Sequence, residues 1–408
     1  MSPAAASHGG ESLRVHEVLC RWAPAYLERF GSSMPSRQQE VLATILQCRT
    51  PALGGALHLC PDCGHQHFNY HSCNDRHCPQ CGVQDADDWL ERNRALLLPV
   101  PYFLVTFTVP EALRPWLRSH PKAGYNLLFD ASSRAMQDLA GNPRRLGASL
   151  GMLGVLHTWG RTLVHHPHVH YLVPGGGLSP DRRQWVPSRA DFLLPVFPLS
   201  DRFRNLFRSL VGTETAVQAY DIPPQVWKQR WVVHSAQAGS GENALRYLSR
   251  YVFKTATGDR VLTLLADGRL RWPYRDSDTA QWRTVDLEPF EFIRRFLQHV
   301  LPPGFHRVRR FGWLHPGGRQ NFNRVRALLG EPPVLTDAER AAWQPESVAP
   351  SAAPPAPTPP STPEPPPTPA KASTWSCPRC KTPMRCVGQW RPGPRAPLLD
   401  RIRSRGPP

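Results

Sequence analysis

Two short stretches of this sequence contain residue types that can act on a phosphodiester. His168-Val169-His170 places two imidazoles two positions apart, and Tyr247 and Tyr251 follow downstream, separated by four positions. Alternate residues of a strand point to the same face of a sheet, so the two imidazoles are expected to lie side by side. Paired imidazoles can hold a divalent cation, and a tyrosine can attack phosphorus and form a covalent link. The pattern therefore predicts a metal-dependent tyrosine nuclease.

The two tyrosines fall in a segment, residues 243–254, with helical periodicity. At about 100° per residue, its apolar stripe consists of Leu245, Leu248 and Val252. Tyr247 and Tyr251 lie on the flank of that stripe, near Arg250 and Lys254. Core tyrosines would belong to the stripe, so this placement favours a chemical role for both phenols. It also favours DNA contact for Arg250 and Lys254.

The histidine pair must be held by a sheet, and alternating apolar residues predict one. The predicted strands are 102–108, 151–157 and 166–173, and a helix is predicted at 126–139. The last two strands are close enough in sequence to form a hairpin. His157 would then lie beside His168 and His170, and it is the predicted third metal ligand, with Glu242 as the alternative.

Cysteines in Cys-x-x-Cys spacing form a second candidate site. Cys60-Pro-Asp-Cys63 and Cys78-Pro-Gln-Cys81 are two knuckles, each of which aims two thiolates at one tetrahedral ion. The simplest prediction is a structural Zn²⁺ on Cys60, Cys63, Cys78 and Cys81, in a module that contacts DNA. The alternatives, which could replace one ligand or begin a second site, are His71, Cys73 and His77.

The composition changes towards the end of the chain. Residues 345–369 are mostly Pro, Ala, Ser and Thr, which predicts an extended, disordered spacer. Beyond it, Cys377, Cys380 and Cys386 resemble half of a zinc ribbon with one coordination place open. The sequence leaves metal binding by this tail undecided.

Residues 290–325 interleave basic and aromatic side chains. Basic side chains neutralise phosphates, and aromatic faces stack on unpaired bases. The predicted DNA contacts of this region are Arg294, Arg295, Arg307, Arg309 and Arg310. A charged surface over an ordinary aromatic core explains the same pattern, and the nuclease motifs favour the DNA interpretation.

The charge of the chain also favours a polyanionic partner. Its 408 residues include 49 Lys+Arg against 32 Asp+Glu, a formal charge of +17. No apolar run approaches the ~20 residues of a membrane span, and no secretory signal is recognised at the N-terminus. We therefore expect a cytoplasmic, nucleoid-associated protein without membrane contact, whose ten cysteines are zinc ligands or free thiols.

These motifs resemble a known family. His-hydrophobic-His followed by Tyr-x-x-x-Tyr resembles the HUH endonuclease superfamily, and the surrounding sequence is similar to the two-tyrosine, rolling-circle insertion-sequence transposases. The matching runs are Tyr102–Pro110, Gly154–Gly177, Arg246–Val252 and Glu291–Gly312, and Cys60–Cys81 resembles the family's zinc-binding region. The resemblance implies an α+β fold centred on an antiparallel-sheet HUH nuclease palm with helices on one face. It also implies Mg²⁺ or Mn²⁺ on the histidines, single-stranded DNA at element ends as substrate, and a 5′-phosphotyrosine intermediate.

A division into domains follows from these patterns. The expected parts are an N-terminal helical segment (1–55), a zinc-binding module (56–94), the nuclease domain (95–275), a basic helical region (276–344), a Pro-rich linker (345–372) and a Cys-containing tail (373–408). Plasmid replication initiators and conjugative relaxases share the histidines and tyrosines and are the alternative enzymes. A non-catalytic zinc-dependent DNA-binding regulator is the alternative from another class, and a nicking assay with and without Mn²⁺ separates it from the enzymes.

Overall fold

The computed structural model of the protein describes residues 10–81, 83–213, 222–252, 257–276, 279–335 and 375–391. These residues belong to two compact units. The larger unit comprises Met1–Cys48, Cys73–Pro333 and Ala396–Pro408, and the smaller unit comprises Arg49–Ser72 and Val334–Arg395. The smaller unit is thus built from an early and a late part of the chain.

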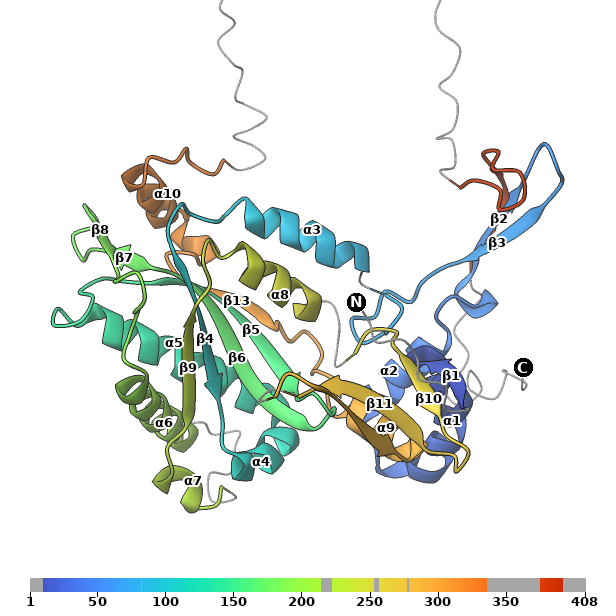
Figure 1. The fold of residues 1–408 in the computed structure, drawn as a ribbon, viewed down its shortest axis with the longest axis horizontal. Helices are drawn as coiled ribbons and strands as arrows, with labels where there is room; N and C mark the ends of the chain where they lie inside the picture. The colour runs from blue at the N-terminus through green and yellow to red at the C-terminus, as the bar shows by residue number, and fades with distance from the viewer. Residues whose placement is uncertain are drawn as a thin grey trace, which may run out of the picture. The chain divides into compact units, whose positions relative to one another are not determined.

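A five-stranded antiparallel sheet forms the centre of the larger unit (Figure 1). Its strands are β4 (Tyr102–Thr108), β5 (Gly151–Trp159), β6 (His165–Pro174), β9 (Val232–Gln237) and β13 (Val308–Gly312), in the order β13-β5-β6-β4-β9. The strands β5 and β6 form the expected hairpin, and β4 pairs with the other edge of β6. The predicted α+β class with antiparallel sheets is therefore confirmed.

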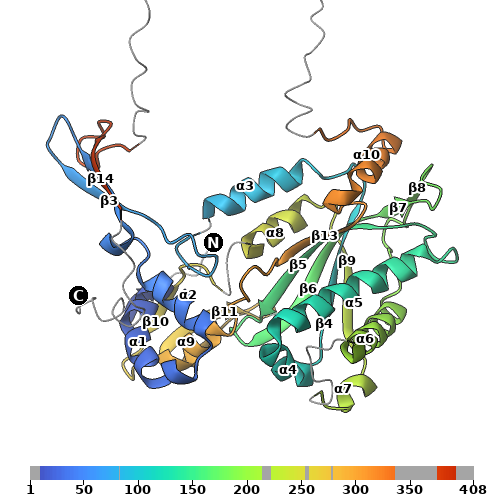
Figure 2. The same cartoon turned by 180° about the vertical axis from the view of Figure 1, so that it is seen from behind.

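One face of this sheet carries the main apolar core. Phe103, Val105 and Phe107 of β4 are buried there because alternate residues of the strand point the same way. They pack with α5 (Pro121–Gly141) and α6 (Val196–Thr213), which lie in front of the sheet in Figure 2. This face holds no candidate catalytic residue, and its role is to keep the sheet rigid.

The opposite face is also covered by helices. Leu153 and Val155 of β5 pack in a separate core with α8 (Glu242–Val252), and α8 in turn contacts α3 (Val83–Arg94) (Figure 1). The prediction that helices lie on one face was wrong. Eight of the nine residues of β5 are buried, so apolar side chains on both faces of the sheet need cover.

A second sheet and three helices form another core in the larger unit. Their bounds are β1 (Glu11–Arg14), β10 (Val261–Leu264), β11 (Leu270–Arg275), β12 (Trp282–Leu287), α1 (Val15–Phe30), α2 (Ser36–Leu46) and α9 (Pro289–Leu297). The N-terminal β1 pairs with β10, so that Leu13 lies across from Leu262. Leu19 of α1 and Phe292 of α9 are buried in the same core. The helices α1 and α2 of the predicted segment 1–55 and α9 of the predicted region 276–344 therefore share one core.

The smaller unit contains a three-stranded sheet. Its strands are β2 (Gly55–Leu59), β3 (Gln66–Tyr70) and β14 (Arg385–Trp390), in the order β14-β2-β3. A strand from the Cys-containing tail thus pairs with a hairpin that precedes it by some three hundred residues. The sequence offered no local pattern for this pairing.

The remaining elements are short or peripheral. They are α4 (Arg114–Ser119), α7 (Gln225–Lys228), α10 (Arg319–Leu328), β7 (Gly176–Leu178) and β8 (Trp185–Pro187). The predicted Pro-rich linker 345–372 lies outside the described residues. Within the part of the chain that the structure describes, the helices are too short or too polar to cross a membrane.

Candidate functional site

Three histidines gather on the face of the central sheet that α8 covers. His157 of β5 lies directly across from His168 of β6, and Val155 lies across from His170. The ring centroids are 5.2 Å apart for His157 and His168, 4.5 Å for His157 and His170, and 4.8 Å for His168 and His170. One ligand atom of each lies within 4.8 Å of the others. The cross-strand register therefore lets all three imidazoles converge on one point.

Hydrogen bonds orient two of these imidazoles. His168 Nδ1–H donates to the carbonyl oxygen of His166 at 2.7 Å, and His170 Nδ1 bonds to Thr106 Oγ1 at 2.7 Å. With Nδ1 engaged, each ring presents Nε2, and the buried Nε2 of His170 has no hydrogen-bond partner among the described residues. Burial lowers the pKa of His170 to about 4 and holds the pKa of His157 and His168 well below the ordinary value. The imidazoles are therefore neutral at neutral pH, the state that binds a cation.

Tyr247 approaches the histidines from α8. Its ring centroid lies 5.9 Å from that of His170 and 6.4 Å from that of His157. Its helix neighbours Leu245 and Leu248 are buried against the sheet, whereas Tyr247 is 39% exposed. The expected placement on the flank of the apolar stripe brings the phenol to the histidines while leaving it open to solvent.

Gly241 fixes where α8 begins. Its φ is +80°, a backbone conformation that favours glycine, and a Cβ atom there would lie 2.7 Å from the Tyr102 ring. Tyr102 is buried in the core that α8 shares with the sheet. The absence of a side chain at Gly241 thus lets the helix start directly over β4.

Other residues predicted for this site lie elsewhere or outside the description. Glu242, the alternative third ligand, pairs with Arg94 and Arg246, each at 3.1 Å, and is not part of the histidine group. The side chains of Arg250 and Tyr251, and the whole of Lys254, lie outside the described residues. Both tyrosines belong to α8, and among the described side chains of this helix Tyr247 lies against the histidines.

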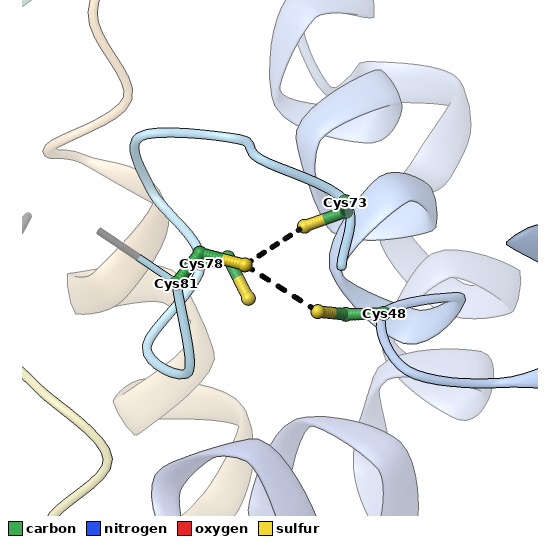
Figure 3. A group of neighbouring side chains, drawn as sticks. All are labelled: Cys48, Cys73, Cys78 and Cys81. Atoms are coloured by element: carbon green, nitrogen blue, oxygen red, sulfur yellow. Dashed lines mark hydrogen bonds between the residues drawn. The ribbon is translucent and has the colours of Figure 1, made fainter. Parts of the chain in front are cut away.

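Figure 3 shows a cysteine cluster in the larger unit. Its Sγ atoms, from Cys48, Cys73, Cys78 and Cys81, all lie within 4.8 Å of one another. Cys48 follows α2, and Cys78 and Cys81 flank the turn that precedes α3. The distance from Cys81 Sγ is 3.5 Å to Cys48 Sγ and 3.8 Å to Cys73 Sγ. Four sulfurs about 2.3 Å from one tetrahedral Zn²⁺ lie roughly 3.8 Å apart, so this spacing fits a closed zinc site.

A second cysteine cluster lies in the smaller unit. It consists of Cys60 and Cys63 from the β2–β3 turn and Cys377 and Cys380 from the tail. The Sγ distances are 3.4 Å for Cys60 and Cys380, 3.5 Å for Cys63 and Cys377, and 3.6 Å for Cys63 and Cys380. Cys386, the other tail cysteine, is not part of this group.

The predicted grouping of Cys60, Cys63, Cys78 and Cys81 around one ion was therefore wrong. Cys60 and Cys63 occupy the turn of a hairpin whose five-residue strands separate that turn from the hairpin's own base by roughly 15 Å. The thiols in the turn group with Cys377 and Cys380, whereas those that follow the base group with Cys48 and Cys73. A signal was present, because the pattern Cys-Pro-x-Cys occurs at 60–63, 78–81 and 377–380.

Comparison with known proteins shows which family combines these features. Residues 151–321 match a family model described as "Putative transposase", and residues 18–109 match "Transposase zinc-binding domain". The chain is 40% identical over 339 residues to "Putative transposase y4qJ" of Sinorhizobium fredii, across 78% of this chain and 84% of that protein. It belongs to the two-tyrosine IS91 family of transposases.

A further relative agrees with this assignment. The transposase is 30% identical over 302 residues to "Transposase for insertion sequence element IS801" of Pseudomonas savastanoi pv. phaseolicola, across 67% of this chain and 70% of that protein. No solved structure matches it. A transposase acts on DNA, so the predicted nucleic-acid partner follows from the family.

The matched regions include most of the clustered residues. The histidines and Tyr247 of the transposase fall within 151–321, and the cysteine cluster of its larger unit falls within 18–109. Cys377 and Cys380 lie outside both regions. The tail cysteines are therefore a feature that the family models do not describe.

Three of the arginines predicted to contact DNA are engaged within the transposase. Arg307 is only 5% exposed, its guanidinium lies over the Trp159 ring, and burial lowers its pKa to about 9. Arg309 and Arg310 donate to asparagine side chains of α5 and α3. The prediction of DNA contact was wrong for Arg307, because this residue directly precedes strand β13 of the central sheet and is buried there.

Arg294 and Arg295 instead border a basic pocket of about 200 Å³. The other residues that line it are Glu111, Arg114, Pro115, Arg118, Val164, His165 and Gln298. Glu291 accepts hydrogen bonds from Arg294 and Arg295 and offsets part of the charge, although half of the Arg294 side chain stays exposed. The pocket adjoins the start of β6, the strand that carries His168 and His170. Four guanidinium groups make it attractive to a phosphate.

Proposed function

We propose that this transposase cleaves single-stranded DNA at the ends of its insertion element through a phosphotyrosine on Tyr247. The observation that supports this most strongly is the position of the Tyr247 ring, 5.9 Å from the His170 ring and 6.4 Å from the His157 ring. A nucleophile and a set of metal ligands within reach of one phosphate are the components that such a reaction needs. The family of the chain favours this function over replication initiation or conjugative relaxation.

The proposed ligands of Mg²⁺ or Mn²⁺ are His157, His168 and His170. The neutral imidazoles, two of them buried and that of His168 partly buried, fit a cation at this point, as does the orphaned Nε2 of His170 among the described residues. When bound, the cation would supply Lewis-acid stabilisation of the charge on the scissile phosphate. The protein keeps the imidazoles neutral by burial and aims two of them through Thr106 and the carbonyl oxygen of His166.

The proposed reaction conserves the energy of the broken phosphodiester bond in a covalent link to the protein. The phenol oxygen of Tyr247 bonds to phosphorus while the bond from phosphorus to the 3′-oxygen breaks. The phenol proton passes to solvent, and the departing oxygen takes up a proton and becomes a 3′-hydroxyl. A 3′-hydroxyl can later displace Tyr247 from the 5′-phosphotyrosine, which rejoins DNA without ATP.

We assign the second nucleophilic role to Tyr251. It follows Tyr247 by four positions in α8, one helical turn, a spacing that places side chains on the same flank. Two phenols would allow a second strand to be cleaved while the first is still attached. This assignment rests on the sequence, because the Tyr251 side chain lies outside the described residues.

The basic pocket is the proposed contact of the DNA backbone beside the cleavage site. Its four arginines are Arg114, Arg118, Arg294 and Arg295. Each phosphate that they neutralise would release counterions, so DNA binding should weaken as salt concentration rises. The formal charge of +17 for the whole chain points the same way.

We assign a structural Zn²⁺ to Cys48, Cys73, Cys78 and Cys81. Three of these thiols are buried in the core that α1, α2 and α9 form. A zinc ion there would tie the segment before α3 to the end of α2. The family model described as a zinc-binding domain covers all four cysteines.

A cleavage assay on single-stranded oligonucleotides that carry the element's ends tests the proposed function. With Mn²⁺, the wild-type protein should nick the oligonucleotide and form a protein–DNA adduct that survives denaturation. The double variant Tyr247→Phe/Tyr251→Phe should bind the same DNA and form no adduct, and Tyr274→Phe in β11 is the matched control. DNA binding without any nicking by the wild-type protein would instead support the non-catalytic regulator.

A further inference from the structure

We propose that the smaller unit is a zinc ribbon assembled from both ends of the chain, in which Cys60, Cys63, Cys377 and Cys380 bind one Zn²⁺. Four thiolates form a closed site that leaves no position for a substrate, so the role of the ion is structural. Cys63 and Cys377 are 314 positions apart in the sequence. The region matched by the zinc-binding domain model ends at residue 109 and includes only the first cysteine pair.

The two cysteine pairs lie in turns that repeat one another's backbone hydrogen bonds. Cys60 N–H donates to the carbonyl oxygen of His65 at 2.9 Å. In the tail, Cys377 N–H donates to the carbonyl oxygen of Thr382 at 2.8 Å, over the same five-position spacing. Two unrelated loops would not share this pattern, whereas the two knuckles of a zinc ribbon need it to aim both thiolates at the ion.

The repetition extends to backbone dihedral angles. Gly64 and Lys381 each follow the first cysteine of their pair by four positions, and their φ angles are +67° and +66°. Each donates its N–H to the carbonyl oxygen of that cysteine, at 3.1 Å for Gly64 and 2.9 Å for Lys381. Lysine rarely adopts a positive φ, so the tail turn keeps an unfavourable conformation that the knuckle geometry requires.

The tail is also bonded to the hairpin beyond its cysteines. Strand β14 pairs with β2 from Arg385, across from Leu59, to Trp390, across from Gly55. Between the knuckles, Thr382 Oγ1 donates to Asp62 Oδ2 at 2.6 Å. These contacts place the two cysteine pairs face to face at one end of the three-stranded sheet.

The described residues of this unit form little apolar core. Its buried hydrophobic cluster consists of Cys60, Cys377 and Met384, so that two of the three members are thiols. Phe68 and Val387 of its strands are 49% and 54% exposed. Sheets of this size depend on a metal or a disulfide for stability. The Sγ distances of 3.4 to 3.6 Å exceed the ~2.0 Å of a disulfide and fit a shared ion.

Zinc content of the full-length protein tests this site without reference to DNA cleavage. The wild-type chain should contain about two equivalents of zinc, one for each cysteine cluster. Cys377→Ser/Cys380→Ser should lower this to about one, because the cluster of the larger unit remains. Cys386→Ser is the matched control and should keep both equivalents, since Cys386 lies outside the cluster.

Two results would overturn the proposal. One is a zinc content in the tail double variant equal to that of the wild type, and the other is the loss of one equivalent in Cys386→Ser. A wild type with one equivalent that the tail double variant loses would contradict only the zinc assigned to the cluster of the larger unit. These outcomes are independent of whether Tyr247 is a nucleophile, because no step of the assay involves DNA.

A second experiment tests whether the ion joins the two ends of one chain. A protease site introduced within residues 345–372 of the full-length protein allows the tail to be cut from the remainder. The released tail fragment should co-purify with the rest of the chain and dissociate when a strong zinc chelator is added. Dissociation without chelator, or retention of the fragment in the Cys377→Ser/Cys380→Ser variant, would contradict a zinc-dependent link.

Discussion

The histidine cluster and the tail cysteine cluster hold their candidate metal ligands in opposite ways. His157, His168 and His170 project from two strands of a five-stranded sheet with apolar cores on both faces. The tail cluster places four thiols in two turns of a three-stranded sheet with almost no core. The fold therefore positions the imidazoles without help, whereas a metal must help to position the thiols.

The two clusters also differ in the number of ligands that they offer to a metal, three imidazoles against four thiols. Three imidazoles would leave coordination places on a bound metal for phosphate oxygens, and a candidate nucleophile, Tyr247, lies beside them. Four thiolates complete a tetrahedron and leave none. Ligand number and surroundings together would separate a metal that serves a reaction from one that serves the fold.

The largest effect is expected at the histidine cluster. His170→Ala should lower the rate of oligonucleotide cleavage by about a thousandfold or more, because the metal loses a ligand at the scissile phosphate. Thermal unfolding and zinc content should change little, since the sheet holds this position by its own packing. Single-turnover cleavage with saturating Mn²⁺ and metal analysis measure the two properties. A thousandfold loss accompanied by loss of zinc would break the separation.

A smaller effect is expected at Thr106, which forms a hydrogen bond with His170. Thr106→Val removes the hydroxyl that bonds to His170 Nδ1 while keeping the shape of the side chain. Partners that orient a metal ligand are typically worth about 10–100-fold in activity or metal affinity. The Mn²⁺ concentration required for half-maximal cleavage should rise accordingly. An unchanged Mn²⁺ dependence would show that Thr106 does not orient the ring, and Thr108→Val in the same strand is the control.

The two cysteine clusters should differ in how their loss affects the larger unit. Cys78→Ser should lower its thermal unfolding temperature by several degrees, because Cys78 is buried in the core shared by α1, α2 and α9. Cys377→Ser should leave that temperature nearly unchanged, since Cys377 belongs to the smaller unit. Differential scanning calorimetry of both variants, with Cys20→Ser as a control outside either cluster, makes the comparison. Equal shifts for Cys78→Ser and Cys377→Ser would mean that the clusters are coupled.

The smallest effect is expected from the buried imidazole of His299, which should make the stability of the fold depend on pH. His299 is completely buried between Thr158 and Leu163, and burial lowers its pKa to about 4. Unfolded histidine titrates near pH 6.5, so below that pH the unfolded state binds the extra proton and the folded state does not. Stability should fall as the pH drops from about 6.5 towards 4, by roughly 2 kcal/mol at pH 5 from this residue. Urea unfolding at about pH 6.5 and pH 5 should show a smaller loss of stability for His299→Gln than for the wild-type protein. An equal loss in the two proteins would refute this assignment.

Local pattern was enough to predict the elements that carry the histidine cluster. The alternation in residues 151–157 and 166–173 corresponds to β5 and β6, and the stripe of α8 faces the sheet as its periodicity predicts. The hairpin then places His157 across from His168 without any long-range information. Side chains that a single hairpin brings together, such as His157 and His168, can therefore be predicted from sequence.

Long-range pairing is what local pattern could not supply. The partners of Cys60 and Cys63 lie more than three hundred positions away, beyond the Pro-rich stretch, and β14 is a short, mostly exposed strand. Arg307 lies in a basic and aromatic stretch that suggested DNA contact, but the strand that follows it, β13, joins the central sheet, and Arg307 is buried. In each case the outcome depends on which distant segment packs against the residue, and local pattern does not reveal that segment.

The covalent adduct itself tests the central claim most directly. Wild-type protein incubated with Mn²⁺ and an oligonucleotide that carries an element end should form a denaturation-resistant complex. Digestion and mass spectrometry of that complex should locate a 5′-phosphorylated DNA remnant on Tyr247 or Tyr251, and on Tyr247 alone in the Tyr251→Phe variant. An adduct on any other residue, such as Tyr274 or the buried Tyr171, would contradict the account. Cleavage with no adduct at all would contradict it as well.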